Sequence, residues 1–144
     1  MVFVRLGGRT VRGFCGSILR VDLHESRIEI EHPTEDFYRR YGGGSALNTH
    51  YLLRNMPAGA DAFSPDNVLG LSVGPATGIP VPGQSRVTCT AKSPLTGAVG
   101  DSQAGGFWPA ELKHAEFDGI IVSGRADHPV YLWIHDGEAE LRDA

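Results

Sequence analysis

Cysteine is scarce in this sequence. Only Cys15 and Cys89 occur among the 144 residues, and they lie far apart in the chain. Structural zinc sites and iron–sulfur clusters need about four ligands, usually in closely spaced pairs such as C-x-x-C. The six histidines form no H-x-x-x-H pair, and no G-x-S-x-G motif marks a nucleophile. We therefore assign no metal-ligating and no catalytic residue to this chain.

Basic clusters and long apolar runs are also missing. The formal net charge is -4 and the Lys and Arg residues are scattered, which argues against a nucleic-acid partner or an anionic membrane surface. No run approaches the roughly 18 apolar residues of a membrane span, and the first residues lack the continuous apolar core of a signal peptide. We expect a cytoplasmic protein with no membrane partner and with both thiols reduced.

Glycine, in contrast, is abundant, with 19 residues that separate the patterned segments. Alternation of apolar and polar residues predicts a β-hairpin from residues 13–23 and 27–32. Thr34 is a favourable N-cap for a short helix that stops at residues 42–44, and Ser45 is expected to cap the next helix. The remaining patterns predict helices at residues 46–56 and 106–115 and strands at residues 68–74, 86–93, 119–124, 130–136 and 139–144.

These elements predict an α+β fold. Strands and helices do not alternate strictly, so we expect mainly antiparallel β-sheets with short helices on one side. The length suits a single domain. We place this domain at residues 13–144 and treat residues 1–12 as an N-terminal extension.

The most informative stretch is "TAKSPLTGAVGDSQAGGFWPAELKHAEFDGIIVSGR", residues 90–125. Gly105 and Gly106 are expected directly before a helix, where bare backbone N–H groups are able to bind an anion or a polar ligand. The alternative is that both glycines only form a tight turn. "GGRTVRG" and "YGGGS" match neither G-x-x-x-x-G-K-[ST] nor G-x-G-x-x-G, so we interpret them as caps and turns. Spacing thus predicts a site without naming its ligand.

The sequence resembles the N-terminal domain of the aldehyde ferredoxin oxidoreductase family, the tungsten- or molybdenum-pterin enzymes. The resemblance covers nearly the whole chain after Gly13 and is carried, in family order, by "GSILRVDL", "YGGGSALNTHYLL", "FSPDNVLGLSVGPATG", "GQSRVTCTAKSPLTG", "AGGFWPAELKHAEFDGIIVSGRA" and "PVYLWIHDGEAELRDA". It implies a base of β-sheets on which two pyranopterins holding one metal lie, while later helical domains supply the other wall.

The resemblance also implies the cofactor-binding residues. Arg86 corresponds to the family's arginine before K-S-P-L-T-G, whose guanidinium is suited to pterin carbonyl or phosphate oxygens. The polar and glycine positions before the helix correspond to Gln103, Ala104, Gly105 and Gly106. Family members often carry Asn-Ser where this chain has Gln103 and Ala104, so a contact that depends on the Asn side chain is lost or lengthened here.

The remaining expectations follow from what the family has and this chain does not. The family's [4Fe-4S] cluster is held by four cysteines in the later domains, and the chain ends at "RDA", where the family continues. We expect a fragment, a truncated product or a subunit, completed by helical domains or by a partner and delivering electrons to a ferredoxin-type acceptor. The complete assembly would be an enzyme with a tungsto- or molybdo-bispyranopterin, and the isolated chain is expected to be inactive. A homo-oligomer stays open, as does a stand-alone binding or scaffold module without redox activity.

Overall fold

A computed structural model describes residues 3–6 and 9–144, with side chains described from residue 13 onward. The elements, in chain order, are β1 (Phe3–Leu6), β2 (Arg9–Arg12), β3 (Ile18–Asp22), β4 (Arg27–Glu31), α1 (Glu35–Tyr41), α2 (Gly44–Asn55), β5 (Leu69–Val73), β6 (Val87–Lys92), β7 (Val99–Ala104), α3 (Trp108–His114), β8 (Gly119–Ser123), β9 (Val130–His135) and β10 (Glu138–Asp143). β1 and β2 pair with each other, and Gly7 and Gly8 of the "GGRTVRG" segment lie outside the described residues.

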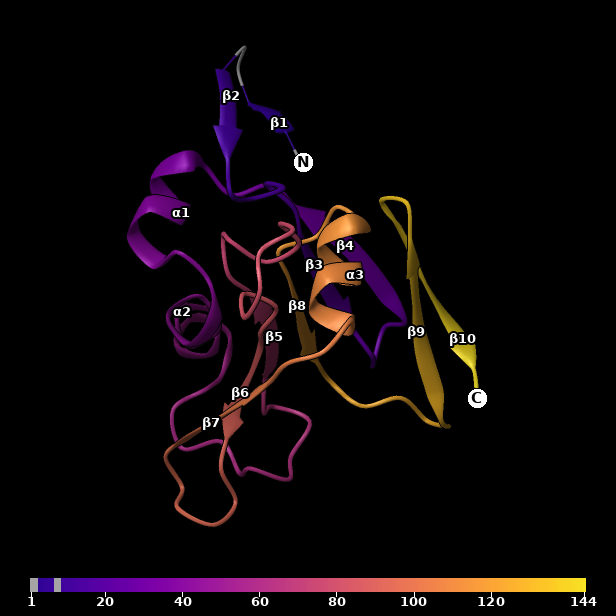
Figure 1. The fold of residues 1–144 in the computed structure, drawn as a ribbon. Helices are drawn as coiled ribbons and strands as arrows, with labels where there is room; N and C mark the ends of the chain where they lie inside the picture. Colours follow the sequence, from indigo (N-terminus) through magenta and orange to yellow (C-terminus); the bar gives the residue numbers. More distant parts are fainter. Residues whose placement is uncertain (1–2, 7–8) are drawn as a thin grey trace.

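A central sheet organises the chain (Figure 1). Its strand order is β4-β3-β8-β5-β6-β7, and β9 with β10 forms a separate two-stranded sheet. Every neighbouring pair is antiparallel except β3 and β8, which run parallel. The predicted α+β fold with mainly antiparallel pairing is therefore confirmed.

The predicted hairpin is formed by β3 and β4, with Ile18 opposite Glu31 and Asp22 opposite Arg27. Its turn is stabilised locally, because Asp22 Oδ1 accepts hydrogen bonds from the N–H groups of His24 at 3.0 Å and Glu25 at 3.1 Å. Such an Asx-type turn is encoded by neighbouring residues alone. The alternation pattern and the turn residues were therefore sufficient to predict this hairpin.

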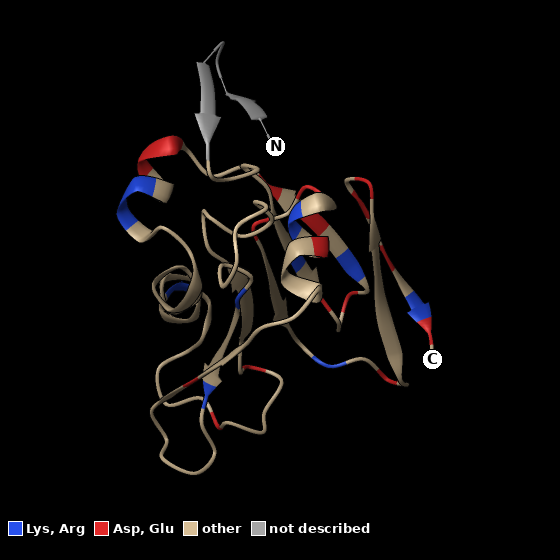
Figure 2. Ribbon diagram, viewed as in Figure 1, with Lys and Arg blue, Asp and Glu red and all other residues tan. Residues whose placement is uncertain are grey.

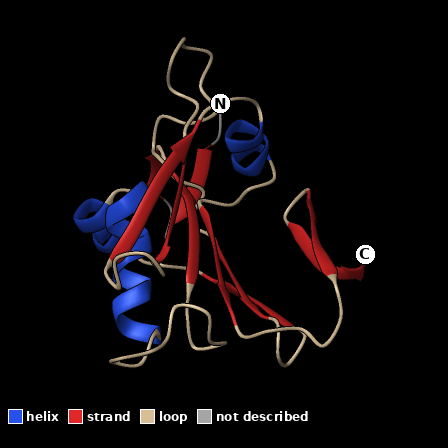
Figure 3. Ribbon diagram, turned by 90° about the horizontal axis from the view of Figure 1, so that it is seen from below, coloured by secondary structure: helices blue, strands red, loops and turns tan. Residues whose placement is uncertain are grey.

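The helices lie on both faces of the central sheet, which corrects the expectation of helices on one side (Figure 3). Leu47 and Leu52 of α2 pack with Ile121 of β8, in a core that also contains residues of α1. Leu112 of α3 packs with Ile120, the preceding residue of β8, in a second core that β9 and β10 also cover. Successive strand residues point to opposite faces, so the two cores lie on opposite sides of the sheet.

The two predicted helix caps had different outcomes. Thr34 caps α1 as predicted, because its Oγ1 accepts the Phe37 N–H at 3.3 Å. Ser45 does not cap α2, which already begins at Gly44 with Gly43 as its N-cap. Gly43 lies directly against β5: a Cβ at this position would come within 2.3 Å of the Val73 carbonyl oxygen. The glycine run therefore permits close packing of a helix end on the sheet.

Within residues 13–144, β7 is the strand that the sequence patterns do not predict, and β1 and β2 lie in the segment that we interpreted only as an N-terminal extension. Nearly all residues of β7 are exposed, so it carries no apolar stripe and no alternation. Its full antiparallel ladder with β6, from Lys92 opposite Val99 to Val87 opposite Ala104, holds it in place. β7 therefore forms through backbone hydrogen bonds to a neighbour rather than through burial of its own side chains.

Candidate functional site

The β6–β7 ladder brings the predicted binding residues together. Its last pair is Val87 and Ala104, so Arg86 and Gly105 are the next residues on the two adjacent strands. The connection continues one residue further, where the Ser85 Oγ donates a hydrogen bond to the Gly106 carbonyl at 2.6 Å. Arg86 and the segment from Gln103 to Gly106 therefore lie at one end of the same pair of strands.

This end of the sheet is open to solvent. Arg86, Gln103 and Ala104 are exposed, and Arg86 takes part in none of the ion pairs found among residues 13–144. Phe107, which follows the two glycines, has 88% of its surface exposed. The guanidinium of Arg86 is thus free to pair with an anionic or carbonyl-bearing group that approaches this edge.

The two glycines differ in their backbone requirements. Gly106 has a φ of 101°, a conformation that side-chain-bearing residues rarely adopt, so its turn alone accounts for glycine. Gly105 has no such φ, and a Cβ there would meet only the Ser85 carbonyl oxygen, at an ordinary 3.5 Å. The tight-turn interpretation therefore holds for Gly106 and does not account for Gly105.

The helix that follows is shorter than predicted. α3 begins at Trp108, with Phe107 as its N-cap and Pro109 in its first turn, so the glycines do not precede it directly. Pro109 has no N–H group, which reduces the number of donors at this helix end. Any backbone donors for a ligand must come mainly from the turn that contains Gly105 and Gly106.

Sequence reasoning missed the residues that close the loop before Arg86. Gln84 Oε1 accepts the Gly78 N–H at 3.1 Å, and Gln84 Nε2 donates to the Ile79 carbonyl at 2.6 Å. With Ser85 bonded to Gly106, these contacts hold the loop against the start of α3. Both residues lie in the block "GQSRVTCTAKSPLTG" that carries the resemblance, but no pattern assigns them a role, because their partners are defined only by the path of the loop.

The two cysteines are not activated as nucleophiles. Burial, followed by the nearby Asp101 carboxylate, raises the pKa of the Cys89 thiol. Burial and Asp118 raise the pKa of the Cys15 thiol to about 12. Thiolates are the reactive form of cysteine, so neither residue is prepared for nucleophilic chemistry. The site is equipped to bind and position a group rather than to attack one.

A cavity of about 530 Å³ lies between α3, the central sheet and β9. Its lining residues are Leu71, Trp108, Glu111, Leu112, His114, Ala115, Ile120, Val122, Leu132, Trp133, Ile134, His135 and Asp136. None of the predicted binding residues is among them. The candidate site is therefore an exposed edge and is separate from this cavity.

Charged residues are dispersed over the described part of the fold, with Lys and Arg alternating in space with Asp and Glu (Figure 2). Within residues 3–6 and 9–144, no cluster of three His, Cys, Asp or Glu side chains is arranged to hold a metal ion. The longest helix there, α2, has 12 residues, and no helix of the described chain is long and apolar enough to cross a membrane.

Comparison with known proteins agrees with the sequence resemblance. A tungsten-containing aldehyde ferredoxin oxidoreductase from Pyrococcus abyssi is 44% identical over 132 residues, which cover 92% of this chain and 22% of the relative. The corresponding protein of Pyrococcus furiosus is 39% identical over the same share. A second Pyrococcus furiosus protein, an aliphatic sulfonate oxidoreductase WOR-like subunit, is 35% identical. The chain thus spans about a fifth of the length of these relatives.

A solved structure supports the same relationship. The active site complex BamBC of benzoyl coenzyme A reductase, determined with 1,5-dienoyl-CoA, superimposes with a TM-score of 0.88 at 35% identity, over 92% of this chain and 20% of that one. The family model for the aldehyde ferredoxin oxidoreductase N-terminal domain matches residues 18–144. Since this match covers most of the chain, the protein belongs to the aldehyde ferredoxin oxidoreductase family and contains its N-terminal domain.

Proposed function

We propose that this chain forms a cofactor-facing wall of an aldehyde ferredoxin oxidoreductase-type enzyme. In this proposal a metal-bound bispyranopterin lies against Arg86, Gln103, Ala104, Gly105 and Gly106. The observation that carries the proposal is the β6–β7 pairing, which sets Arg86 beside the two glycines on one exposed edge. Tungsten is favoured over molybdenum because the similar oxidoreductases are tungsten-containing.

The residues at this edge fit a large, flat, polar group. Ala104, Gly105 and Gly106 carry little or no side chain, and nothing lies within 4 Å of the position that a Cβ on Gly106 would occupy. Backbone groups are therefore able to approach a ligand closely. The planar guanidinium of Arg86 presents several N–H donors that match phosphate or carbonyl oxygens. This chain would thus bind, orient and neutralise the charge of the group.

The bound group would supply the redox chemistry, as cofactors generally do while the protein positions them. Gln103 would add the hydrogen-bond donor and acceptor of its side-chain amide. Because burial raises the pKa of the Cys89 thiol, we infer no covalent attachment through this cysteine. The wall is accordingly a binding surface whose contribution is geometry and charge.

A further part of the enzyme would cover this edge. Phe107, which directly follows the two glycines, has 88% of its surface exposed, and the next residue, Trp108, has 47%. Large apolar side chains that gather at an exposed edge are typical of contact surfaces. The similar proteins are about four times as long as this chain, so we propose that their remaining helical domains, or a partner subunit, supply the [4Fe-4S] cluster, the ferredoxin-type acceptor site and any self-association.

An arginine-to-lysine exchange tests the proposal. Arg86→Lys keeps the charge and removes the planar pair of donors, so the pterin and tungsten content of the assembled enzyme should fall while the melting temperature of the chain stays the same. Arg125→Lys, at another exposed arginine, in the loop between β8 and β9, is the control and should change neither quantity. Full pterin content in the Arg86→Lys enzyme would remove Arg86 from the site. An assembly that never contains pterin would favour the scaffold module instead.

A further inference from the structure

Asp118, between α3 and β8, is a meeting point of three chain segments. It is 1% exposed, and its carboxylate accepts the N–H groups of Cys15 at 2.9 Å and Gly16 at 2.7 Å. Its own N–H donates to the Ser17 carbonyl at 2.9 Å, and its carbonyl accepts the Val73 N–H at 3.0 Å. One residue therefore joins the segment before β3, the end of β5 and the start of β8.

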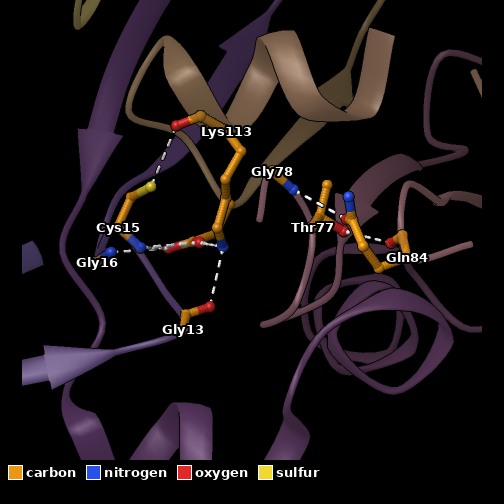
Figure 4. A network of polar contacts seen from close by, with 8 residues as sticks. Gly13, Cys15, Gly16, Thr77, Gly78, Gln84 and Lys113 are labelled. Carbon is orange, nitrogen blue, oxygen red and sulfur yellow. Dashed lines mark hydrogen bonds and ion pairs between the residues drawn. The ribbon is translucent and has the colours of Figure 1, made fainter. Parts of the chain in front are cut away.

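Lys113 of α3 completes this arrangement. It is 3% exposed, its Nζ forms an ion pair with Asp118, and the same Nζ donates to the Gly13 carbonyl at 3.1 Å. Figure 4 shows Lys113 extending toward the chain segment that carries Gly13, Cys15 and Gly16, with a dashed line from its Nζ to the Gly13 carbonyl. The buried pair thus fixes the last turn of α3 to the segment at residues 13–16.

The loop after β5, at residues 74–78, lies against Lys113 on one side and against Gly13 on the other. A Cβ on Gly78 would lie 3.3 Å from Lys113 Cγ, and a Cβ on Gly13 would lie 3.0 Å from Pro75 Cβ. The aliphatic stem of Lys113 and the backbone at Gly13 therefore contact the loop at residues 74–78. Close packing of this kind transmits displacement, because protein interiors are not readily compressed.

The same loop leads to the candidate cofactor site. Gly78 forms a hydrogen bond with Gln84, and Ser85 forms one with Gly106. Arg86 is the next residue of this loop, while Gly105 and Gly106 lead into α3, which carries Lys113. A continuous set of contacts therefore runs from the buried pair to both sides of the site.

We propose that Lys113 and Asp118 are positioning residues, which fix the loop ending at Arg86 relative to the turn at Gly105 and Gly106. A buried ion pair gives little net stability compared with apolar residues of similar volume, because both charges lose their hydration. The hydrogen bonds from Asp118 to several separate segments, however, fix how these segments are oriented relative to one another, which apolar packing alone does not do. That Lys113 and Asp118 position the cofactor site rests on the proposed function, whereas that they hold the loop in place does not.

Amide hydrogen exchange of the full chain tests the fixing of the loop directly. The double variant Lys113→Met/Asp118→Asn removes both buried charges together, so that neither is left without a partner. We expect residues 76–86 to exchange at least about tenfold faster in this variant, with residues 47–55 of α2 unchanged. Val68→Ala, in the core on the opposite face of the sheet, is the control for general destabilisation and should affect both regions alike. Unchanged exchange at residues 76–86 in the folded double variant would overturn the proposal.

Gln84→Ala gives an independent test that leaves the buried pair intact. Gln84 is only partly buried, so this variant should fold and should increase exchange at residues 78–86 without affecting α3. Unchanged exchange there would also overturn the proposal. The pterin content of the assembled enzyme is then measured for the same variants, and it should fall in both. A loosened loop with full pterin content would support positioning of the loop and contradict the proposed cofactor site.

Discussion

Replacing Gly105 and Gly106 separately distinguishes a ligand requirement from a backbone requirement. Gly105→Val introduces a side chain where a Cβ meets only the Ser85 carbonyl oxygen at 3.5 Å, with no positive φ to strain it. Gly106→Ala introduces a methyl group into open space, but at a φ of 101°. The first change should therefore obstruct the surface and spare the fold, and the second should strain the fold and add little bulk.

The expected magnitudes differ accordingly. An exposed substitution without strain usually changes the free energy of unfolding by no more than about 0.5 kcal/mol. A residue other than glycine in a sparsely populated backbone region costs roughly 1–3 kcal/mol. For a chain of this size each kcal/mol corresponds to about 2–4 °C in melting temperature. Gly106→Ala should thus melt several degrees lower than Gly105→Val.

Two measurements decide the outcome. Circular dichroism gives the melting temperature of each chain, and fluorescence of the released pterin gives the cofactor content of the assembled enzyme. We expect Gly105→Val to melt like the original chain and to lose pterin. If Gly105→Val melts as low as Gly106→Ala, the assignment of strain to Gly106 alone is wrong. If Gly105→Val retains full pterin, Gly105 does not face the cofactor.

Three further predictions concern the body of the fold. At about pH 8 a thiol reagent should modify Cys89 well before Cys15. Burial raises the Cys15 pKa from 9.0 to about 12, which lowers the fraction of Cys15 present as thiolate roughly a thousandfold. Modification of both cysteines at the same rate in the folded chain would contradict this prediction. Burial lowers the pKa of His50 from 6.5, so the unfolded state binds this proton more tightly and stability is lost as the pH falls below that value. The denaturant midpoint should therefore shift less between about pH 7.5 and pH 5 in His50→Gln than in the original chain. An equal shift in both chains would show that His50 does not contribute to the pH dependence of stability. Gly70→Ala should destabilise the chain by about 1–3 kcal/mol in urea unfolding, because a Cβ there would approach the buried Asn48 side chain to 2.8 Å; an unchanged midpoint would show that Asn48 moves freely.

Elements defined by neighbouring residues were predictable from the sequence. The β3–β4 hairpin has its alternation and its Asp22 turn within one short segment, and α1 has Thr34 at its start. β7 was not predictable in this way, because its exposed residues follow no pattern and only the ladder to β6 defines it. The covering of both sheet faces was not predictable either, because it results from the packing of α2 and α3 on opposite sides of β8.

In the candidate site, too, the residues could be named from the sequence but their arrangement could not. Arg86 and Gly105 were named from a family resemblance, whereas their proximity results from the β6–β7 register. Spacing alone left the ligand and turn interpretations of the glycines open, since φ is not visible in a sequence. The buried pair of Lys113 and Asp118 was not anticipated at all. Its hydrogen-bond partners, such as Cys15, lie about a hundred residues away in the chain and are brought close only by folding.

The glycines also show why Gly105 gives the sharpest test of the proposed site. Most glycines in the described chain have either a positive φ or a neighbour that a Cβ would press against, as Gly43 has with the Val73 carbonyl. Among the described glycines, Gly74 and Gly105 alone have neither feature. The folded chain therefore gives no internal reason for glycine at Gly105, and a side chain there would extend over an exposed edge. A requirement for glycine at this position, if experiment finds one, must come from a group outside this chain.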